Sequence, residues 1–294
     1  MEVHADWNRQ LRVLDPRGRQ LLISCGCALF NARVALAADG HHVNVERFPD
    51  RERSDVVARL TLTGESGQPL PIGALDPSID ERRTNRRRFA DDLVPAELVN
   101  GLVAAAKAEG AELVQVTSSD DLRTIARLSQ QADKLEIEDP AYRAELEAWT
   151  TDDPRRLDGV QAASAPFAGV DSSSGGDSDS VPIRVFDTTG MGWLPADAGS
   201  STDQCLLLLG TARDDRAAWV AAGEALERVF LEITRSGYAA SPLTQLIEVT
   251  RTCEKLRNGL KLKMHPDVLL RVGRAPETVA TRRRPLADLI NGMD

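Results

Sequence analysis

Apolar positions along this chain follow two spacings that alternate from segment to segment. Spacings of three and four residues, which place apolar side chains on one helix face, predict helices over residues 16–38, 77–84, 95–109, 120–135, 140–149, 216–236 and 248–256. Short alternating or continuous apolar runs predict strands over residues 2–5, 43–47, 56–64, 111–116, 204–209 and 268–272. Helices and strands are therefore expected to succeed one another along most of the chain.

The regular pattern lapses between residues 150 and 203, where Asp, Ser, Gly and Pro are frequent. The run Ser172-Ser173-Ser174-Gly175-Gly176-Asp177-Ser178-Asp179 has the composition of a flexible linker. Its two aspartates argue against a glycine loop that holds phosphate, because such a loop collects donors to bind an anion. An irregular stretch of this length predicts a lid, a linker or a mobile surface segment.

Two of the predicted helices carry matching sequences, which indicates an internal duplication. The segments Cys25-Gly26-Cys27-Ala28-Leu29 and Ala222-Gly223-Glu224-Ala225-Leu226 stand at corresponding places, and Gly40 and Gly237 close the two helices at equal distances. We expect two unequal units, at residues 1–75 and 76–294. The first is expected to be incomplete, since the chain opens directly on its first strand.

Charge and composition disfavour several function classes. The 294 residues carry a formal net charge of -9, and the sequence pI is about 5.1. Proteins that bind nucleic acid usually present a broad basic face. No apolar run approaches the roughly 20 residues of a transmembrane helix, and the first residues do not form a secretory signal. We therefore expect a cytoplasmic protein with neither nucleic acid nor a membrane as its partner.

The cysteines and histidines do not form a pattern that binds a metal. Cys25 and Cys27 are two residues apart in a predicted helix and so point to different faces. Cys205 and Cys253 have no nearby partner in the sequence, and the four histidines are scattered. Free buried thiols and no metal site are expected.

A basic cluster is the main chemical signal. The segment Glu81-Arg82-Arg83-Thr84-Asn85-Arg86-Arg87-Arg88-Phe89 holds five arginines in seven residues. Like charges repel, so such a cluster on an acidic chain indicates an anionic partner, and the guanidinium fork suits phosphate. A second cluster, Arg282-Arg283-Arg284, is expected to converge on the same phosphate. The alternative is a solvated helix end whose arginines pair with Glu81, Asp91 and Asp92.

The same residues resemble a known family. The order Arg82-Arg83-Thr84-Asn85-Arg86, followed by Phe89, resembles the phosphate-binding opening of the nitroreductase-like flavoproteins. Gly237-Tyr238-Ala239-Ala240-Ser241-Pro242-Leu243 resembles the stretch of that family that passes the flavin ring. Arg271-Val272-Gly273 and Arg283-Arg284-Pro285-Leu286 resemble its C-terminal strand and phosphate-binding arginine. Asp139-Pro140-Ala141-Tyr142-Arg143-Ala144-Glu145-Leu146, with Trp149, is similar to the signature of the Acg-type subfamily.

The resemblance implies an α+β nitroreductase fold in which two fused, unequal units imitate the family dimer and keep one FMN site. It assigns the phosphate and ribityl oxygens of FMN to Arg82, Arg83, Thr84 and Arg86. It places Ser241, Pro242, Leu243 and Thr244 near the isoalloxazine ring, and it closes Arg283 and Arg284 on the phosphate. A monomer that imitates a dimer, or a homodimer, is expected.

The implied function is an FMN-dependent oxidoreductase that passes electrons from NAD(P)H to a nitroaromatic or quinone-like acceptor. No catalytic side chain is assigned, since the chemistry belongs to the flavin. Two alternatives stay open: a non-catalytic protein that sequesters FMN under a closed lid, and a truncated homologue that binds no flavin. The truncated homologue is an alternative because the subfamily's Ala-Pro-Ser-x-x-Asn-x-Gln-Pro-Trp segment is absent. Thr244-Gln245 also stand where nitroreductases tend to have Glu-Gly.

Overall fold

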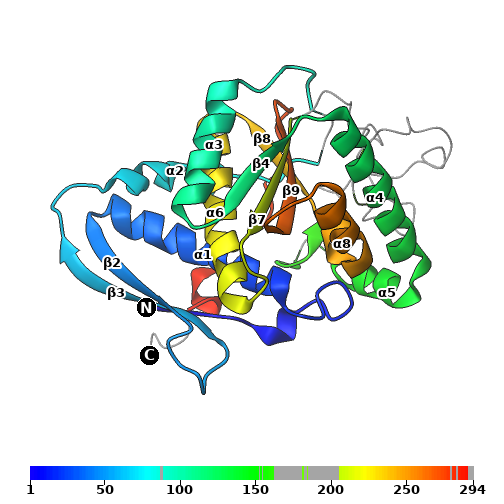
Figure 1. The fold of residues 1–294 in the computed structure, drawn as a ribbon. Helices are drawn as coiled ribbons and strands as arrows, with labels where there is room; N and C mark the ends of the chain where they lie inside the picture. The colour runs from blue at the N-terminus through cyan, green and yellow to red at the C-terminus, as the bar shows by residue number, and fades with distance from the viewer. Residues whose placement is uncertain are drawn as a thin grey trace.

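Helices and two main antiparallel sheets make up the described part of the chain. In this computed structural model that part comprises residues 1–86, 89–151, 153, 155–161, 181, 184, 205–278, 280–282 and 284–290. Figure 1 shows the long helices α1 (Arg19–Ala38) and α6 (Arg216–Arg235) in the middle of the molecule, with the larger sheet beside them. The predicted α+β class is confirmed.

The smaller sheet lies at the start of the chain and has the order β1-β3-β2. Its strands are β1 (Glu2–His4), β2 (His41–Arg47) and β3 (Val56–Glu65), and both outer strands pair with β3 in antiparallel register. Helix α1 connects β1 to β2. The hairpin of β2 and β3 extends away from the rest of the molecule (Figure 1).

The larger sheet has the order β4-β7-β9-β8 and is antiparallel throughout. Its strands are β4 (Glu112–Val116), β7 (Cys205–Thr211), β8 (Ala239–Leu243) and β9 (His265–Gly273). Leu207 and Leu209 pack in one hydrophobic cluster with α6 and with α3 (Ala96–Ala108). Leu206 and Leu208 pack in another with α4 (Ser119–Glu138) and α8 (Thr250–Gly259). Both faces are covered, which explains the continuous apolar run in β7. We call the two sides the α6 face and the α4 face.

The two sheets surround their long helices in the same order. The first follows the chain as β1, α1, β2 and β3, and its sheet order is β1-β3-β2. The second follows the chain as β7, α6, β8 and β9, and these strands have the order β7-β9-β8. The second also has β4 at its edge and two helices between β8 and β9.

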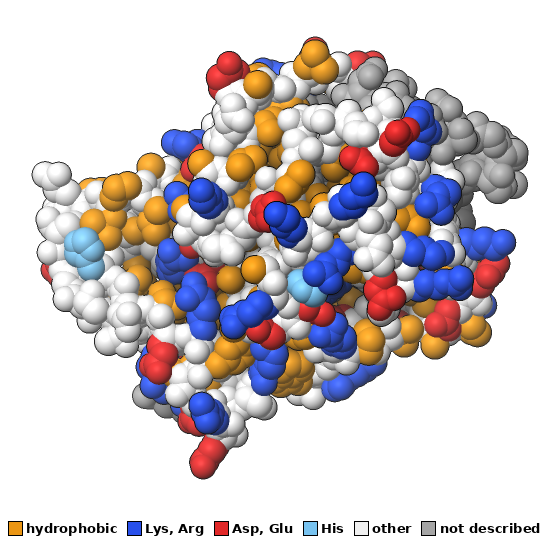
Figure 2. All heavy atoms as spheres, in the orientation of Figure 1, with side chains coloured by type: hydrophobic (Ala, Val, Ile, Leu, Met, Phe, Trp, Pro, Cys, Tyr) orange, Lys and Arg blue, Asp and Glu red, His pale blue; other side chains and the backbone are white. Residues whose placement is uncertain are grey.

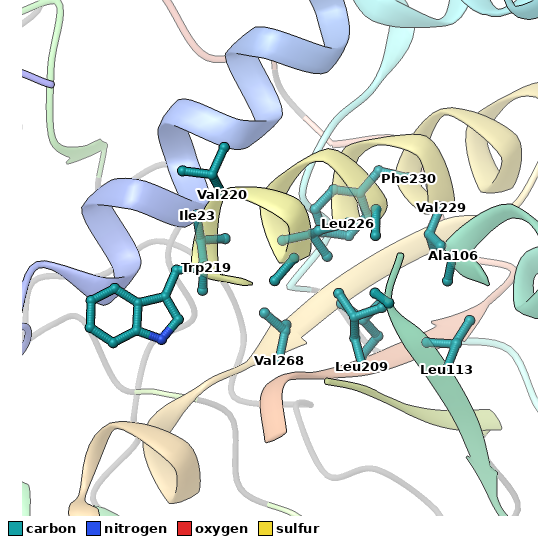
Figure 3. Packing of buried hydrophobic residues seen from close by; sticks show 14 of the residues in the cluster. Ile23, Ala106, Leu113, Leu209, Trp219, Val220, Leu226, Val229, Phe230 and Val268 are labelled. Carbon is teal, nitrogen blue, oxygen red and sulfur yellow. The ribbon is translucent and has the colours of Figure 1, made fainter. Parts of the chain in front are cut away.

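Helices α1 and α6 cross at a pair of glycines. A Cβ atom on Gly26 would lie 2.2 Å from the carbonyl oxygen of Val220, and one on Gly223 would lie 2.0 Å from that of Ile23. The contacts are reciprocal, because each glycine meets the carbonyl three residues before the other. Figure 3 shows Ile23, Trp219 and Val220 side by side near this crossing, with Leu113, Leu209 and Val268 of the larger sheet below. Only residues without a side chain allow this close approach.

Shorter elements connect these parts. They are η1 (Trp7–Arg9), η2 (Pro71–Leu75), α2 (Asp76–Glu81), α5 (Pro140–Ala148), β5 (Thr150–Thr151), β6 (Val160–Gln161), α7 (Gln245–Glu248) and η5 (Leu286–Asp288). Asp139 caps α5, since its carboxylate accepts the N–H of Ala141 at 2.8 Å, and Pro140 occupies the first helical position. The segment predicted as a lid or linker lies largely outside the described residues.

Three of the differences from the sequence-based expectation have an identifiable cause. The helix predicted from residue 16 begins at Arg19, since Gly18 has a φ of 72° and the carboxylate of Asp15 accepts the N–H of Leu21 at 3.0 Å. The helix predicted over residues 248–256 is two helices that meet at Val249. Strand β8 was not predicted, because it contains Pro242; as an edge strand, it tolerates the missing N–H.

The sequence contains no unbroken apolar run of membrane-spanning length, but helix α1 reaches that length in the structure. Among the described residues, this is the one helix that is long and apolar enough to cross a membrane, with 20 residues and a mean hydropathy of 1.8. Helix α1 is not recognisable as a continuous apolar run in the sequence, because polar side chains such as Asn31 and Arg33 interrupt it. Leu22, Leu29 and Phe30 of this helix are fully buried within the fold.

Candidate functional site

The described arginines of the basic cluster do not point to one place. Arg82 follows α2, and its Nε lies 3.2 Å from Oε1 of Glu227 on α6. Its guanidinium also lies over the ring of Phe230, 5.6 Å from the centroid. Because the Glu227 side chain is only 4% exposed, it needs a nearby cation. Arg82 therefore has a structural partner inside the protein.

Arg83 takes a different direction. Its Nη1 donates to the carbonyl oxygens of Asp80 and Arg82, the latter at 2.8 Å, so it satisfies the carbonyl end of α2. Arg83 and Asn85 line a cleft of about 510 Å³ between the ends of α2 and α6 and the segment that follows β9. Asn85 is buried, and its Nδ2 donates to the carbonyl of Pro276 at 2.7 Å.

The centre of the cluster is attached to strand β8. Thr84 forms a parallel bridge with Ala240, and the N–H of Asn85 donates to the carbonyl of Ala240 at 3.0 Å. These contacts place residues 84–86 beside the start of β8. Two segments of the predicted site, far apart in the sequence, are thus neighbours.

Arg86 is half-buried. Burial, together with the nearby charge of Arg184, lowers the pKa of Arg86 to about 10. The guanidinium stays charged at neutral pH even so. Arg87 and Arg88 lie outside the described residues.

Ser241 and Arg271 form a buried polar pair on the α4 face. They are opposite one another in the pairing of β8 with β9, and the next pair on the same face is Leu243 with Leu269. Ser241 is 1% exposed, and its hydroxyl has no hydrogen-bond partner among the described residues. Arg271 is fully buried over the ring of Phe89, 4.1 Å from its centroid, and burial lowers the pKa of Arg271 to about 10.

The end of β8 leads into a buried group of acids and amides. Leu243 belongs to the core, Pro242 and Thr244 are half-buried, and Thr244 immediately precedes α7. The side chain of Gln245 donates to the carboxylate of Asp133 on α4 at 3.1 Å. Burial raises the pKa of Asp133, which makes its neutral form more favourable.

An ion pair completes this group. Arg184 pairs with Glu248 of α7, lies 3.7 Å from Glu136 of α4, and stands over the ring of Tyr142 of α5 at 5.8 Å. Burial, together with the charge of Glu248 and against the opposing effect of Arg184, raises the pKa of Glu136 to about 8. Neither Arg184 nor Glu136 was predicted as a site residue, because Arg184 lies in the irregular stretch and Glu136 in an ordinary helix pattern.

The C-terminal arginines are only partly described. Arg284 is half-buried, while Arg283 lies outside the described residues. Their convergence with the arginine cluster stays a prediction.

Other features of the molecule carry less chemistry. A second cleft of about 260 Å³ lies at the start of α1 and includes Arg17, Arg257 and Glu254. On the face shown in Figure 2, basic and acidic side chains are intermixed. Arg17 at this cleft pairs with Asp214 at 2.8 Å. Within the described ranges, no three His, Cys, Asp or Glu side chains are grouped so that they could hold a metal ion.

Comparison with known proteins decides the family. The chain is 33% identical over 306 residues to "Putative NAD(P)H nitroreductase Rv3131" of Mycobacterium tuberculosis, with 99% of this chain and 82% of that protein covered. It is 29% identical to "Putative NAD(P)H nitroreductase acg" of the same organism, with 97% and 85% covered. The chain belongs to the Acg-type nitroreductase family.

Further comparisons of the Acg-type chain gave two results. No family model matches it. A nitroreductase with bound FMN from Bacteroides fragilis covers 75% of this chain and 98% of its own, at 12% identity and a TM-score of 0.44.

The Acg-type chain thus offers a buried, positively charged and polar region along β8. Such a region can bind and orient a group that brings its own reactivity.

Proposed function

We propose that this protein is an FMN-dependent oxidoreductase that takes electrons from NAD(P)H and passes them to a nitroaromatic or quinone-like acceptor. The relationship to mycobacterial proteins named as NAD(P)H nitroreductases, over nearly the whole chain, is the observation that carries the proposal. FMN comes from the resemblance of the motifs.

The buried polar groups along β8 fit a phosphorylated cofactor. A buried hydroxyl without a partner, as at Ser241, indicates a missing ligand or water. Arg86 and Arg271 bring two guanidinium groups close to β8, and the guanidinium fork suits phosphate.

Each residue has a role in this arrangement. Arg86 and Thr84 hold the phosphate at the start of β8, with Ser241 on the ribityl side. Pro242, Leu243 and Thr244 shape the wall beside the ring. The C-terminal Arg283 and Arg284 close on the phosphate. Arg82 holds the segment in place through Glu227, and Arg83 closes α2, so both support the site indirectly.

When bound, the flavin would accept hydride at its ring and pass electrons onward. The chain's own residues would bind it, orient it and exclude water. Glu136 and Asp133 lie near the end of β8, where burial raises the pKa of both carboxyls, that of Glu136 to about 8. These two carboxyls are the described groups best placed to hold a proton beside the ring.

We also infer that the two sheet-and-helix segments are fused units that imitate a dimer. Their equal strand order and the reciprocal contacts of Gly26 and Gly223 support this inference. Only the second unit follows an arginine cluster, so one flavin site is expected for each chain. The protein would then be a monomer, which sedimentation equilibrium can distinguish from a homodimer.

A sequestering function is the second candidate. Val181 and Arg184, both from the irregular stretch, are buried beside the proposed ring site, and this favours restricted access. Anaerobic addition of NADPH or NADH to the yellow, FMN-loaded protein separates the two functions. Loss of absorbance near 450 nm within a catalytic timescale supports the oxidoreductase, and unchanged colour supports sequestration. Protein that stays colourless after FMN is added contradicts both.

A further inference from the structure

We propose that the cleft of about 260 Å³ at the start of α1 binds a small carboxylic acid in its ionised form, with the carboxylate attached to an apolar ring. The start of α1, the ends of α7 and α8 and the start of β9 form its walls. None of its described lining residues comes from the arginine cluster or from β8. Occupation of this cleft therefore does not require flavin.

One face of α8 supplies a cation to the cleft. Four residues of this helix are three or four positions apart, so they lie on one face, and all of them line the cleft: Thr250, Cys253, Glu254 and Arg257. Arg257 is half-buried, and its Nε is buried without a hydrogen-bond partner among the described residues. A buried donor without a partner costs free energy that a ligand or a water would recover. The guanidinium of Arg257 therefore has donors for an acceptor that the described part of the chain does not supply.

The first turn of α1 supplies further donors. The side-chain Nε2 of Gln20 is also buried without a partner in the described ranges. Arg19 donates to the carbonyl oxygens of Ile247 at 3.1 Å and Pro266 at 3.4 Å, which fix its position but do not neutralise its charge. Burial, against the opposing effect of Arg19, raises the pKa of Asp267 to about 7, so this nearby carboxyl is only partly ionised at neutral pH.

The acids at the cleft are mostly engaged by the protein itself, which favours an anion over a cation as the ligand. Asp214 and Glu248 each pair with an arginine. The carboxylate of Asp15 accepts an N–H at the start of α1, so the end of this helix is already capped. Glu254 is exposed. A cationic ligand would have to displace these contacts, whereas a carboxylate meets donors that have no partner.

The rest of the lining indicates the body of the ligand. Apolar side chains form this part of the wall: Leu14, Pro16, Ile247 and Pro266. The volume of about 260 Å³ corresponds to about nine water molecules at roughly 30 Å³ each, which is room for a single ring that bears one carboxylate. Inorganic phosphate or sulfate would leave the apolar wall uncovered.

The test uses para-fluorobenzoate as the probe and fluorine NMR to measure its binding to the full-length chain, with and without added FMN. Saturable binding of equal affinity is expected in both conditions. Arg257→Met removes the charge and should weaken binding about 10- to 100-fold, the value of lost charge-assisted hydrogen bonds. Gln20→Met should weaken it about 2- to 10-fold, since it removes an uncharged donor. Arg251→Met, at an exposed arginine on the same helix that does not line the cleft, should leave the affinity unchanged.

Cys253 reports where the probe binds. It lines the cleft and is half-buried, whereas the half-buried Cys205 of β7 does not line it. The bound probe should slow alkylation of Cys253 by iodoacetamide and leave the rate at Cys205 unchanged, as measured by peptide mass spectrometry.

Four results would overturn this assignment. They are no saturable binding up to about 5 mM probe, equal affinity in the natural chain and Arg257→Met, binding only when FMN is present, and no protection of Cys253 at saturation. Should Arg257→Met fold poorly, Arg257→Gln replaces it with the same expected loss. Each of these results leaves the proposed function untouched, because flavin binding and its reduction by NAD(P)H are measured without the probe.

Discussion

The crossing of α1 and α6 allows a sharp test of the packing on which the site depends. Replacing Gly223 with Ala places a methyl group 2.0 Å from the carbonyl oxygen of Ile23 and 2.8 Å from the Cα of Gly26. Both neighbours are backbone, so no side chain can rotate away and the helices must separate. Overpacking typically costs about 1–3 kcal/mol in free energy of unfolding, and a clash that only backbone movement relieves should lie at or above the upper end, about 3 kcal/mol. Gly26→Ala should cost a similar amount, since a Cβ there lies 2.2 Å from the carbonyl oxygen of Val220.

Gly101 provides a matched control in α3. It is exposed, and a Cβ built on it meets no atom within 4 Å. Gly101→Ala should therefore raise stability by about 0.5–1 kcal/mol, because alanine is the better helix residue. Urea unfolding followed by circular dichroism measures all three variants. An unfolding midpoint for Gly223→Ala equal to that of the natural chain would refute the close crossing. In the double variant the two losses should not add, since both alanines open the same contact.

Three further results are expected. Burial raises the pKa of Glu136 to about 8, so the folded state holds a proton that the unfolded state releases near pH 4.5. The free energy of unfolding should therefore fall as the pH rises from 4.5 to about 8. Glu136→Gln should remove up to about 1.4 kcal/mol per pH unit of that slope; an unchanged slope in urea titrations would exclude the shifted pKa. Arg82→Met should lower stability by about 3–5 kcal/mol, since it leaves the buried Glu227 carboxylate without its cation. Arg83→Met should cost less than about 1 kcal/mol, and equal losses in calorimetry would contradict this distinction. Burial raises the pKa of the Cys25 thiol to about 11, so this thiol should react with a disulfide reagent at pH 8 only after the chain unfolds. Peptide mass spectrometry measures the labelling, and rapid labelling of Cys25 in the folded chain would be inconsistent with its burial.

Most elements could be predicted from spacing alone, because their apolar residues contact the core at regular intervals. Helix α6 begins and ends within one residue of the predicted range, residues 216–236. Strand β8 could not be predicted, since Ser241 and Pro242 have low strand propensity and β8 forms through its pairing with β9. The start of α1 depended on Asp15, a capping contact that the sequence does not reveal beside Pro16.

The sequence indicates which residue types belong to the candidate site, but it does not indicate where each side chain points. The sequence placed Thr84, Arg86 and Ser241 in one site, and the structure makes Thr84 a neighbour of the strand that holds Ser241. The sequence could not show that Arg82 would pair with Glu227, because that contact joins residues far apart in the chain. Arg271 gave one usable signal, a charge inside an apolar strand. Its place opposite Ser241 depends on strand register, which a single sequence does not specify.

The position of bound FMN tests the account most directly. A crystal structure of the protein grown with FMN should show the phosphate within hydrogen-bond distance of Arg86 and Thr84, on the α4 face beside Ser241. The ring should extend along β8 toward Thr244. A phosphate held instead by Arg83 and Asn85, in the cleft between α2 and α6, would contradict the account.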